Sequence, residues 1–299
     1  MKFKAVMMDF DGTITEKGSI FPSKEMINKI IETARKMPVA FCTGRQLESF
    51  QRRGLGAIVK EIPPSEKKEI LENIFLIGEN GSMGYFFDKK TGKYKEFYRA
   101  KWDDDFLTKR KLKKMIGEKI EEYGEVINEH RVVLVMRAHR EDDSPIEEIY
   151  AKSKKMFEIC DETLSDYNKN YEKYLHLGDS GIGVIICPAK GDKDAGIEKF
   201  AKFLEKKRGM KFSKKFKEIM VIGDSAQKGG NDYYFLQGRF GTPFTVGHFD
   251  KTKPLPTPVL NSKNKRLLHS KGAIYLLENI ENLGLIIWFL NKSAGQNFE

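Results

Sequence analysis

Acidic residues gather at two places in the sequence where apolar runs end. Asp9 and Asp11 follow the run at residues 4–8, within DFDGTIT, and Asp224 and Asp232 belong to the loop after the run at 218–223. If these four carboxylates converge, their burial costs several kcal/mol unless a cation neutralises them. Hard oxygen ligands with room for water favour Mg²⁺. A calcium loop is excluded because its glycine would be the sixth residue, whereas Gly12 is the fourth counted from Asp9.

The apolar runs alternate with helical patterns along the chain. The runs predict strands, and the amphipathic stretches between them predict helices. The predicted strands are 4–8, 39–42, 74–78, 218–223 and 242–247, and the predicted helices begin at Ser23 as N-cap, near Gln46, at 193–207, near Asp232 and near 272–281. This rhythm predicts an α/β fold, a Rossmann-like parallel sheet with helices on both faces, in which ligands bind at the carboxyl ends of strands.

A different rhythm interrupts this core. Two short runs flanking KKTGK predict a hairpin, and helices and strands follow it. The predicted elements are a hairpin of 83–88 and 94–98, a helix at 104–122, a strand at 131–137, a helix at 145–159, and strands near 173–177 and 182–187. We therefore expect an inserted α+β domain at 82–187, within a core formed by 1–81 and 188–299. An insert that emerges beside the strand ends would cover them.

Four motifs in this order give the chain its resemblance to a known family. They are Asp9-Phe10-Asp11-Gly12-Thr13, Thr43, a lysine at a helix start, and the acidic loop at 223–232. The chain resembles members of the haloacid dehalogenase-like (HAD) superfamily of phosphatases and phosphomutases. Together the motifs are specific, whereas the first alone would be a weak signal.

The resemblance implies an aspartyl-phosphate mechanism. Asp9 would attack phosphorus, and Asp11 would protonate the leaving oxygen and then take a proton from water. Two residues apart in extended chain, the two side chains project to the same side. In the family, Mg²⁺ is held by the side chains corresponding to Asp9 and Asp224 and by the backbone carbonyl of Asp11.

The resemblance also implies a phosphate site. Thr43 would hydrogen-bond a phosphoryl oxygen, with Gly44 in the same turn and Arg45 in a supporting position. For the lysine, CPAKGDKDAGI offers Lys190 and Lys193. The family lysine follows a proline and a glycine-containing turn and begins a helix, which favours Lys193 as the group that neutralises phosphate and nucleophile.

The last acidic loop ends in a second polar pair. Asn231 is a candidate phosphate-binding residue, and Asp232 is expected to support the metal through water or to orient Lys193. An N-cap role for Asp232 is compatible with both. Gly229 and Gly230 can form turns closed to bulkier residues.

The insert resembles the large cap of the branch that contains Cof-type, sucrose-phosphate and trehalose-phosphate phosphatases and phosphomannomutase. The sequence at 79–81 (ENG) matches the junction where such caps begin. A cap excludes water and reads the leaving group, so we expect a small phosphorylated substrate. Arg131 and Arg137 are tentative cap residues for that group, together with His139 and Arg140, although each is also compatible with a solvated surface.

Two enzymatic functions remain open. The favoured one is a Mg²⁺-dependent phosphatase acting on a sugar phosphate or similar metabolite, because Thr43-Gly44-Arg45 is phosphatase-like. The alternative is a phosphomannomutase-like mutase, which the six residues Ser225–Gly230 between GD and ND and the stretch PAKGDK resemble. A remote alternative is a basic nucleic-acid-binding protein.

Composition limits these classes further. The chain has 299 residues, of which 40% are hydrophobic, and a net charge of +10. Its basic stretches alternate with apolar residues and acids, as on solvated helix faces, so no nucleic-acid partner is expected. The apolar run Leu285–Leu290 is far shorter than the roughly 20 residues of a membrane span, and no export segment is visible, which favours the cytoplasm. Cys42, Cys160 and Cys187 include no CxxC pair, which argues against a disulfide framework.

Overall fold

A twisted sheet of eight strands forms the centre of the computed structural model within the residues that it describes, 2–127, 130–141 and 143–282. The strand order is β12-β11-β10-β1-β2-β3-β4-β5. These strands are β1 (Ala5–Met8), β2 (Val39–Cys42), β3 (Ile74–Gly78), β4 (Met83–Asp88), β5 (Lys93–Arg99), β10 (Ile219–Gly223), β11 (Thr242–Thr245) and β12 (Thr257–Pro258). All neighbours from β12 to β3 are parallel, so their carboxyl ends share one edge.

Helices cover both faces of this larger sheet, as the sequence predicted. On one face α7 (Lys193–Arg208) packs Ile197, Phe200 and Leu204 against the sheet. On the other face lie α1 (Lys24–Lys36), α3 (Gly56–Glu61), α4 (Lys67–Glu72) and α8 (His269–Glu278). Every residue of the four central strands β1, β2, β3 and β10 is buried, which explains why they read as unbroken apolar runs.

Two predicted helix starts are present, and the first of them has the predicted N-cap. Ser23 Oγ accepts the Met26 amide at 3.2 Å before α1, as predicted. After β2 the chain forms α2 (Leu47–Phe50), a π-helical turn (Gln51–Leu55) and then α3 without a break. The predicted helix near Gln46 is therefore present.

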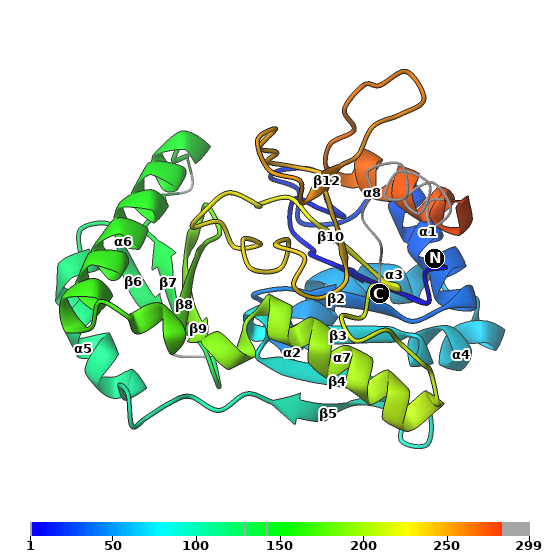
Figure 1. The fold of residues 1–299 in the computed structure, drawn as a ribbon, viewed down its shortest axis with the longest axis horizontal. Helices are drawn as coiled ribbons and strands as arrows, with labels where there is room; N and C mark the ends of the chain where they lie inside the picture. The colour runs from blue at the N-terminus through cyan, green and yellow to red at the C-terminus, as the bar shows by residue number, and fades with distance from the viewer. Residues whose placement is uncertain (1, 128–129, 142, 283–299) are drawn as a thin grey trace.

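A smaller antiparallel sheet, with the order β6-β7-β9-β8, lies beside the larger one (Figure 1). Its strands are β6 (Gly124–Ile127), β7 (Leu134–Ala138), β8 (Leu175–Asp179) and β9 (Gly183–Pro188), and its helices are α5 (Lys109–Ile120) and α6 (Ile146–Tyr167). Both helices pack on the face turned away from the larger sheet. We call β6–β9 with α5 and α6 the cap. The fold class is therefore confirmed: a Rossmann-like core with an additional α+β unit.

The hairpin at 83–99 differs from its predicted place. β4 pairs antiparallel with β3, and β5 with β4, so the hairpin extends the larger sheet instead of joining the insert. Aromatic packing explains this, because Phe86 and Phe97 lie 5.1 and 4.2 Å from the ring of Phe203 on α7. The division into domains at residues 81 and 188 stays a prediction, and this hairpin is better grouped with the core.

Two further predictions need correction or addition. No helix begins at Asp232: residues 231–236 form turns, because the Asp232 carboxylate accepts upstream amides instead of capping a helix. Strand β6 was not predicted.

The run Leu285–Leu290 lies outside the described residues. Among those that are described, no helix is both long and apolar enough to cross a bilayer. All three cysteines are buried and unpaired.

Candidate active site

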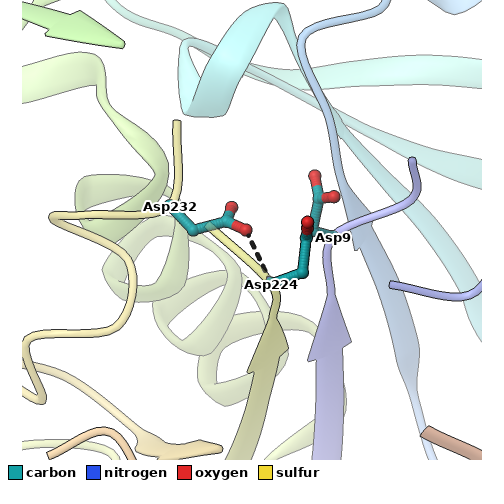
Figure 2. A group of neighbouring side chains, drawn as sticks. All are labelled: Asp9, Asp224 and Asp232. Carbon is teal, nitrogen blue, oxygen red and sulfur yellow. Dashed lines mark hydrogen bonds between the residues drawn. The ribbon is translucent and has the colours of Figure 1, made fainter. Parts of the chain in front are cut away.

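Three carboxylates meet at the carboxyl edge of the larger sheet (Figure 2). Asp9 follows β1 and Asp224 follows β10, and these parallel strands are in register, with Met8 opposite Ile222. Asp232 reaches the same place from the far end of the loop. One oxygen of each side chain lies within 4.8 Å of one oxygen of the other two. The sequence prediction of converging acids is thus met for these three residues.

Lys193 lies among these acids as the first residue of α7. Its side chain is 1% exposed, and Nζ donates to Asp9 Oδ1 at 2.5 Å and to Asp232 Oδ1 at 2.6 Å. Burial lowers the pKa of Lys193, but Asp232 and Asp9 together raise it above its usual value. Lys190 is exposed. Of the two candidate lysines, the structure therefore brings Lys193 to the site.

The site holds more negative than positive charge. Burial raises the pKa of Asp9 well above the usual carboxyl value, because Lys193 does not offset both burial and the repulsion from Asp232 and Asp224. Burial, with repulsion from Asp232, raises the pKa of Asp224 to about 7. One ammonium faces three carboxylates, two of them buried and that of Asp224 half-buried, so positive charge is in deficit when all three are ionised. These carboxylates fit a divalent cation that prefers oxygen ligands, such as Mg²⁺.

Asp232 holds the loop as well as the lysine. Its Oδ2 accepts the amides of Asp224 at 3.0 Å and Ser225 at 3.1 Å, while Oδ1 accepts from Lys193. Figure 2 shows the contact to the Asp224 main chain. Both carboxylate oxygens of Asp232 accept hydrogen bonds, so Asp232 supports the site. Asp9 and Asp224 each keep one carboxylate oxygen, Oδ2, without such a bond among the described residues.

Asp11 lies apart from the buried acids. Its carboxylate is 52% exposed and forms an ion pair with Arg45. The Nε of Arg45 donates to Oδ2 at 3.0 Å, and its Nη2 donates to Oδ1. The guanidinium lies 5.3 Å from the centre of the Phe10 ring, and its buried Nη1 has no hydrogen-bond partner among the described residues. The Arg45 carbonyl accepts the Glu79 amide at 3.0 Å, which fixes the backbone. Arg45 thus connects the first two motifs.

Thr43 and Gly44 form the turn after β2. Thr43 is buried, and its Oγ1 accepts the Arg45 amide at 3.3 Å, so its hydroxyl hydrogen is free to be donated. A Cβ on Gly44 would lie 2.6 Å from Ile185 Cδ1 of β9. The cap therefore contacts this turn directly, and a larger residue at position 44 would require the Ile185 side chain to move.

Asn231 is held by the cap rather than by the acids. Its amide donates to the Asp179 carbonyl at 3.1 Å, and its Oδ1 is buried with no partner among the described residues. Of the tentative cap residues, Arg131 is exposed and lies 3.4 Å from Glu48, and Arg137 is exposed on β7 opposite Glu125 and Gly183. The structure does not bring these two guanidinium groups into contact with the buried carboxylates.

Two residues at the site were not predicted. Thr13 is buried and donates to Asp224 Oδ1 at 3.1 Å. His269 Nδ1 lies 2.6 Å from the Gly12 carbonyl, and because a carbonyl only accepts, Nδ1 carries the proton. Gly12 has φ +78°, and a Cβ there would lie 2.9 Å from Asp224 Oδ2, so this position favours glycine. Thr13 could have been found from its place in DFDGTIT, but His269 gave no signal.

Comparisons with known proteins agree with this architecture. No protein-family model matches the sequence, and no curated protein matches it. Among solved structures, an IMP-nucleotidase of Plasmodium falciparum matches with a TM-score of 0.59 at 13% identity, over 94% of this chain and 71% of that one.

Two sugar-phosphate phosphatases are also similar. The C-terminal domain of C. albicans trehalose-6-phosphate phosphatase has a TM-score of 0.55 at 13% identity, with 94% and 93% covered. The sucrose-phosphatase of Synechocystis sp. PCC6803 has a TM-score of 0.50 at 13% identity, with 94% and 98% covered. All three are capped members of the HAD superfamily. By its similarity to these structures, the chain has the fold of capped members of the HAD superfamily.

Proposed function

We propose that this protein is a Mg²⁺-dependent phosphatase that hydrolyses a small phosphorylated metabolite, with a sugar phosphate as the leading candidate substrate. The observation that supports this most is the buried Lys193 ammonium, which bridges Asp9 and Asp232 beside Asp224. Such a centre combines a nucleophilic carboxylate with positive charge for an incoming phosphoryl group. The fold shared with two sugar-phosphate phosphatases agrees with it.

Asp9 is the nucleophile in this proposal. Lys193 holds its Oδ1, which leaves Oδ2 to attack phosphorus and form an aspartyl-phosphate. The Thr43 hydroxyl and the Gly44 turn bind the phosphoryl oxygens, and the Asn231 carboxamide assists. Lys193 neutralises the transferred group while it remains bonded to Asp232.

Asp11 is the general acid and then the general base. In the structure its carboxylate is exposed and bound to Arg45, so this ion pair must open and Asp11 must take up a proton from solvent before it can protonate the leaving oxygen. Arg45 then has a free guanidinium edge near the substrate. After the leaving group departs, Asp11 takes a proton from the water that attacks the aspartyl-phosphate.

Magnesium would be held by the carboxylates of Asp9 and Asp224 and by the backbone carbonyl of Asp11. When bound, it supplies positive charge that shields the nucleophile from the phosphate. Thr13 orients Asp224 for this role through its hydrogen bond at 3.1 Å.

A phosphosugar mutase is the second candidate, favoured by the six-residue loop Ser225–Gly230. A nucleoside monophosphate is a further candidate substrate, because the fold is shared with an IMP-nucleotidase. Nucleic-acid binding is less well supported, since the net charge of +10 is spread among acids. A cytoplasmic location belongs to the proposal as well.

The mechanism is tested with an aryl phosphate such as p-nitrophenyl phosphate. Phosphate release should require Mg²⁺, stop in excess EDTA and return when Mg²⁺ is restored. Asp9→Asn should lower kcat by at least about 10³-fold, since it removes the nucleophile. Asp104→Asn, at an exposed residue of the segment before α5, is the matched control. Full activity of Asp9→Asn, or full activity in excess chelator, would refute the mechanism.

The mutase is tested with mannose 1-phosphate and a sugar bisphosphate activator. Inorganic phosphate and mannose 6-phosphate are both measured. We expect phosphate release to exceed isomerisation. The opposite ratio would make the mutase the better assignment, and a panel of sugar phosphates and nucleoside monophosphates then ranks the substrates.

A further inference from the structure

Cap strand β8 lies against the side of the site that holds Lys193 and Asp232. His176 Nδ1 is 2.7 Å from Asp192 Oδ2, so the imidazole donates its Nδ1 proton to that carboxylate. The same ring stacks on Tyr234 of the acidic loop's continuation, with 3.6 Å between ring centres and 5° between planes. One cap side chain therefore contacts the segments that carry both functional residues.

Asp192 connects His176 to the lysine. It is 3% exposed and is the N-cap of α7, where its Oδ1 accepts the Ala195 amide at 2.8 Å. On the other side, a Cβ on Gly81 would lie 2.0 Å from the Asp192 carbonyl oxygen and 2.4 Å from the Lys193 nitrogen. The first turn of α7 thus contacts Gly81 on one side and His176 on the other. Lys193, the next residue, has little freedom while both contacts hold.

The long loop Ser225–Gly230 reaches the same strand through its main chain. The Asp179 amide donates to the Gly229 carbonyl at 2.8 Å, and the Asn231 amide donates to the Asp179 carbonyl at 3.1 Å. This is a parallel bridge between Asp179 and Gly230. Gly229 has φ +83°, and a Cβ there would lie 3.0 Å from the Phe157 ring of α6. The loop length noted in the sequence therefore has a structural use: it lets the loop pair with the cap.

We propose that β8 is a positioning strand for the phosphate-binding side of the site. His176 positions Lys193 through Asp192, and the main chain of Asp179 positions Asp232 through Asn231. The cap then contributes to the chemical step itself, in addition to contacting the leaving group. This inference rests on the proposed phosphatase function.

The first test removes the imidazole contact. His176→Leu leaves a buried carboxylate oxygen of Asp192 unpaired, and we expect kcat for p-nitrophenyl phosphate to fall about 10- to 100-fold, the range for lost outer-shell partners, with KM changed less than about twofold. His176→Asn keeps an N–H donor near the Nδ1 position and should restore most of kcat. Lys154→Leu, on the exposed side of α6, is the matched control.

The second test crowds the loop without removing a polar group. A Cβ on Gly178 would lie 3.1 Å from both Cα and Oδ1 of Asn231, so Gly178→Val should push the loop off β8. Amide hydrogen exchange across 225–232 should then become about tenfold faster, as expected when a net main-chain hydrogen bond that protects this segment is lost. His176→Leu should speed exchange at the start of α7.

The outcomes separate this inference from the proposed function. If the wild-type protein releases no phosphate from any substrate, the proposed function fails, and the exchange rates still test the contacts. If the wild type is active, an unchanged kcat in His176→Leu overturns the positioning role. Equal losses in His176→Leu and His176→Asn would also overturn it, as would unchanged exchange of 225–232 in Gly178→Val.

Discussion

Lys193 is the residue on which the charge balance of the candidate site depends. Its ammonium is buried and bonded to two carboxylates, Asp9 and Asp232. Removing one partner of a buried ion pair leaves the other charge desolvated and uncompensated. The same group therefore serves the stability of the free protein and, in the proposed mechanism, the binding of phosphate.

Lys193→Met is expected to abolish phosphatase activity and to destabilise the protein by about 3 kcal/mol or more. The buried carboxylates would have to take up protons, so the loss should be larger at pH 8 than at pH 5. Chemical denaturation in the absence of Mg²⁺ measures it at both pH values. Lys190→Met, on the exposed lysine three residues earlier, is the control. Equal stability of the two variants would contradict the role given to Lys193.

Asp224 gives the site a pH dependence. Its pKa is raised to about 7, mainly by burial, so the free protein carries a proton there below pH 7. Because Mg²⁺ binds the deprotonated carboxylate, the apparent affinity should rise between pH 6 and pH 8 and level off above it. Titration calorimetry at pH 6 in two buffers of different ionisation enthalpy should show proton release on binding. An affinity independent of pH over this range would contradict the shift.

Individual residues could be predicted where a local pattern marks them. Asp9, Asp224 and Lys193 each end a strand or begin a helix, and the edge of a parallel sheet brings such positions together. His269 and Asp179 could not be predicted in this way. The first contacts Gly12 from 257 residues away, and the second acts through its main chain, which no side-chain pattern reports.

The junction after β3 is the element that joins the cap to the larger sheet. Glu79 is 2% exposed and has φ 48°, and its carboxylate accepts the amides of Arg131, Val132 and Val133 at 2.9, 2.6 and 3.2 Å. One side chain therefore satisfies three backbone donors of the segment that enters β7. Without it, the buried amides of Val132 and Val133 would be left without their acceptor.

Glu79→Ala is expected to lower the free energy of unfolding by about 2–4 kcal/mol, because hydrogen bonds to a charged acceptor are among the stronger ones. Urea denaturation measures it. Glu61→Ala, at the exposed end of α3, should change the free energy of unfolding by less than about 0.5 kcal/mol. A Glu79→Ala variant as stable as the Glu61→Ala variant would show that water replaces the carboxylate at the junction.

The positions of strands and helices could be predicted better than the elements against which they pack. The four central strands of the larger sheet, β1, β2, β3 and β10, are apolar runs buried on both faces, and these runs are visible in any window of the sequence. The hairpin β4–β5 was recognised as a hairpin but given to the wrong sheet, since the ring that holds it, Phe203, lies more than 100 residues away. The helix predicted from Asp232 is absent because tertiary hydrogen bonds to Asp224 and Ser225 took the carboxylate that would have capped it.

In the molecule as a whole, the cap and the larger sheet meet at several separate places. Val132, in the segment that enters β7, belongs to the apolar cluster of the larger sheet. Ile185 of β9 contacts Gly44, and β8 pairs with the loop at 229–231. The contacts combine apolar packing, main-chain hydrogen bonds and buried polar pairs. Contacts of several kinds at separate places favour cooperative unfolding of the two sheets.

We therefore expect the cap and the larger sheet to unfold together. Differential scanning calorimetry of the protein without ligands should show one transition, with calorimetric and van't Hoff enthalpies in a ratio near one. Combining Glu79→Ala with Gly178→Val removes the junction contact and displaces the loop, so this double variant should broaden the transition or split it in two. The Glu61→Ala variant should keep the single transition. Two resolved transitions in the wild-type protein would mean that the contacts at β8 and Glu79 are too weak to couple the parts, and the positioning of Lys193 by the cap would then have to be transient.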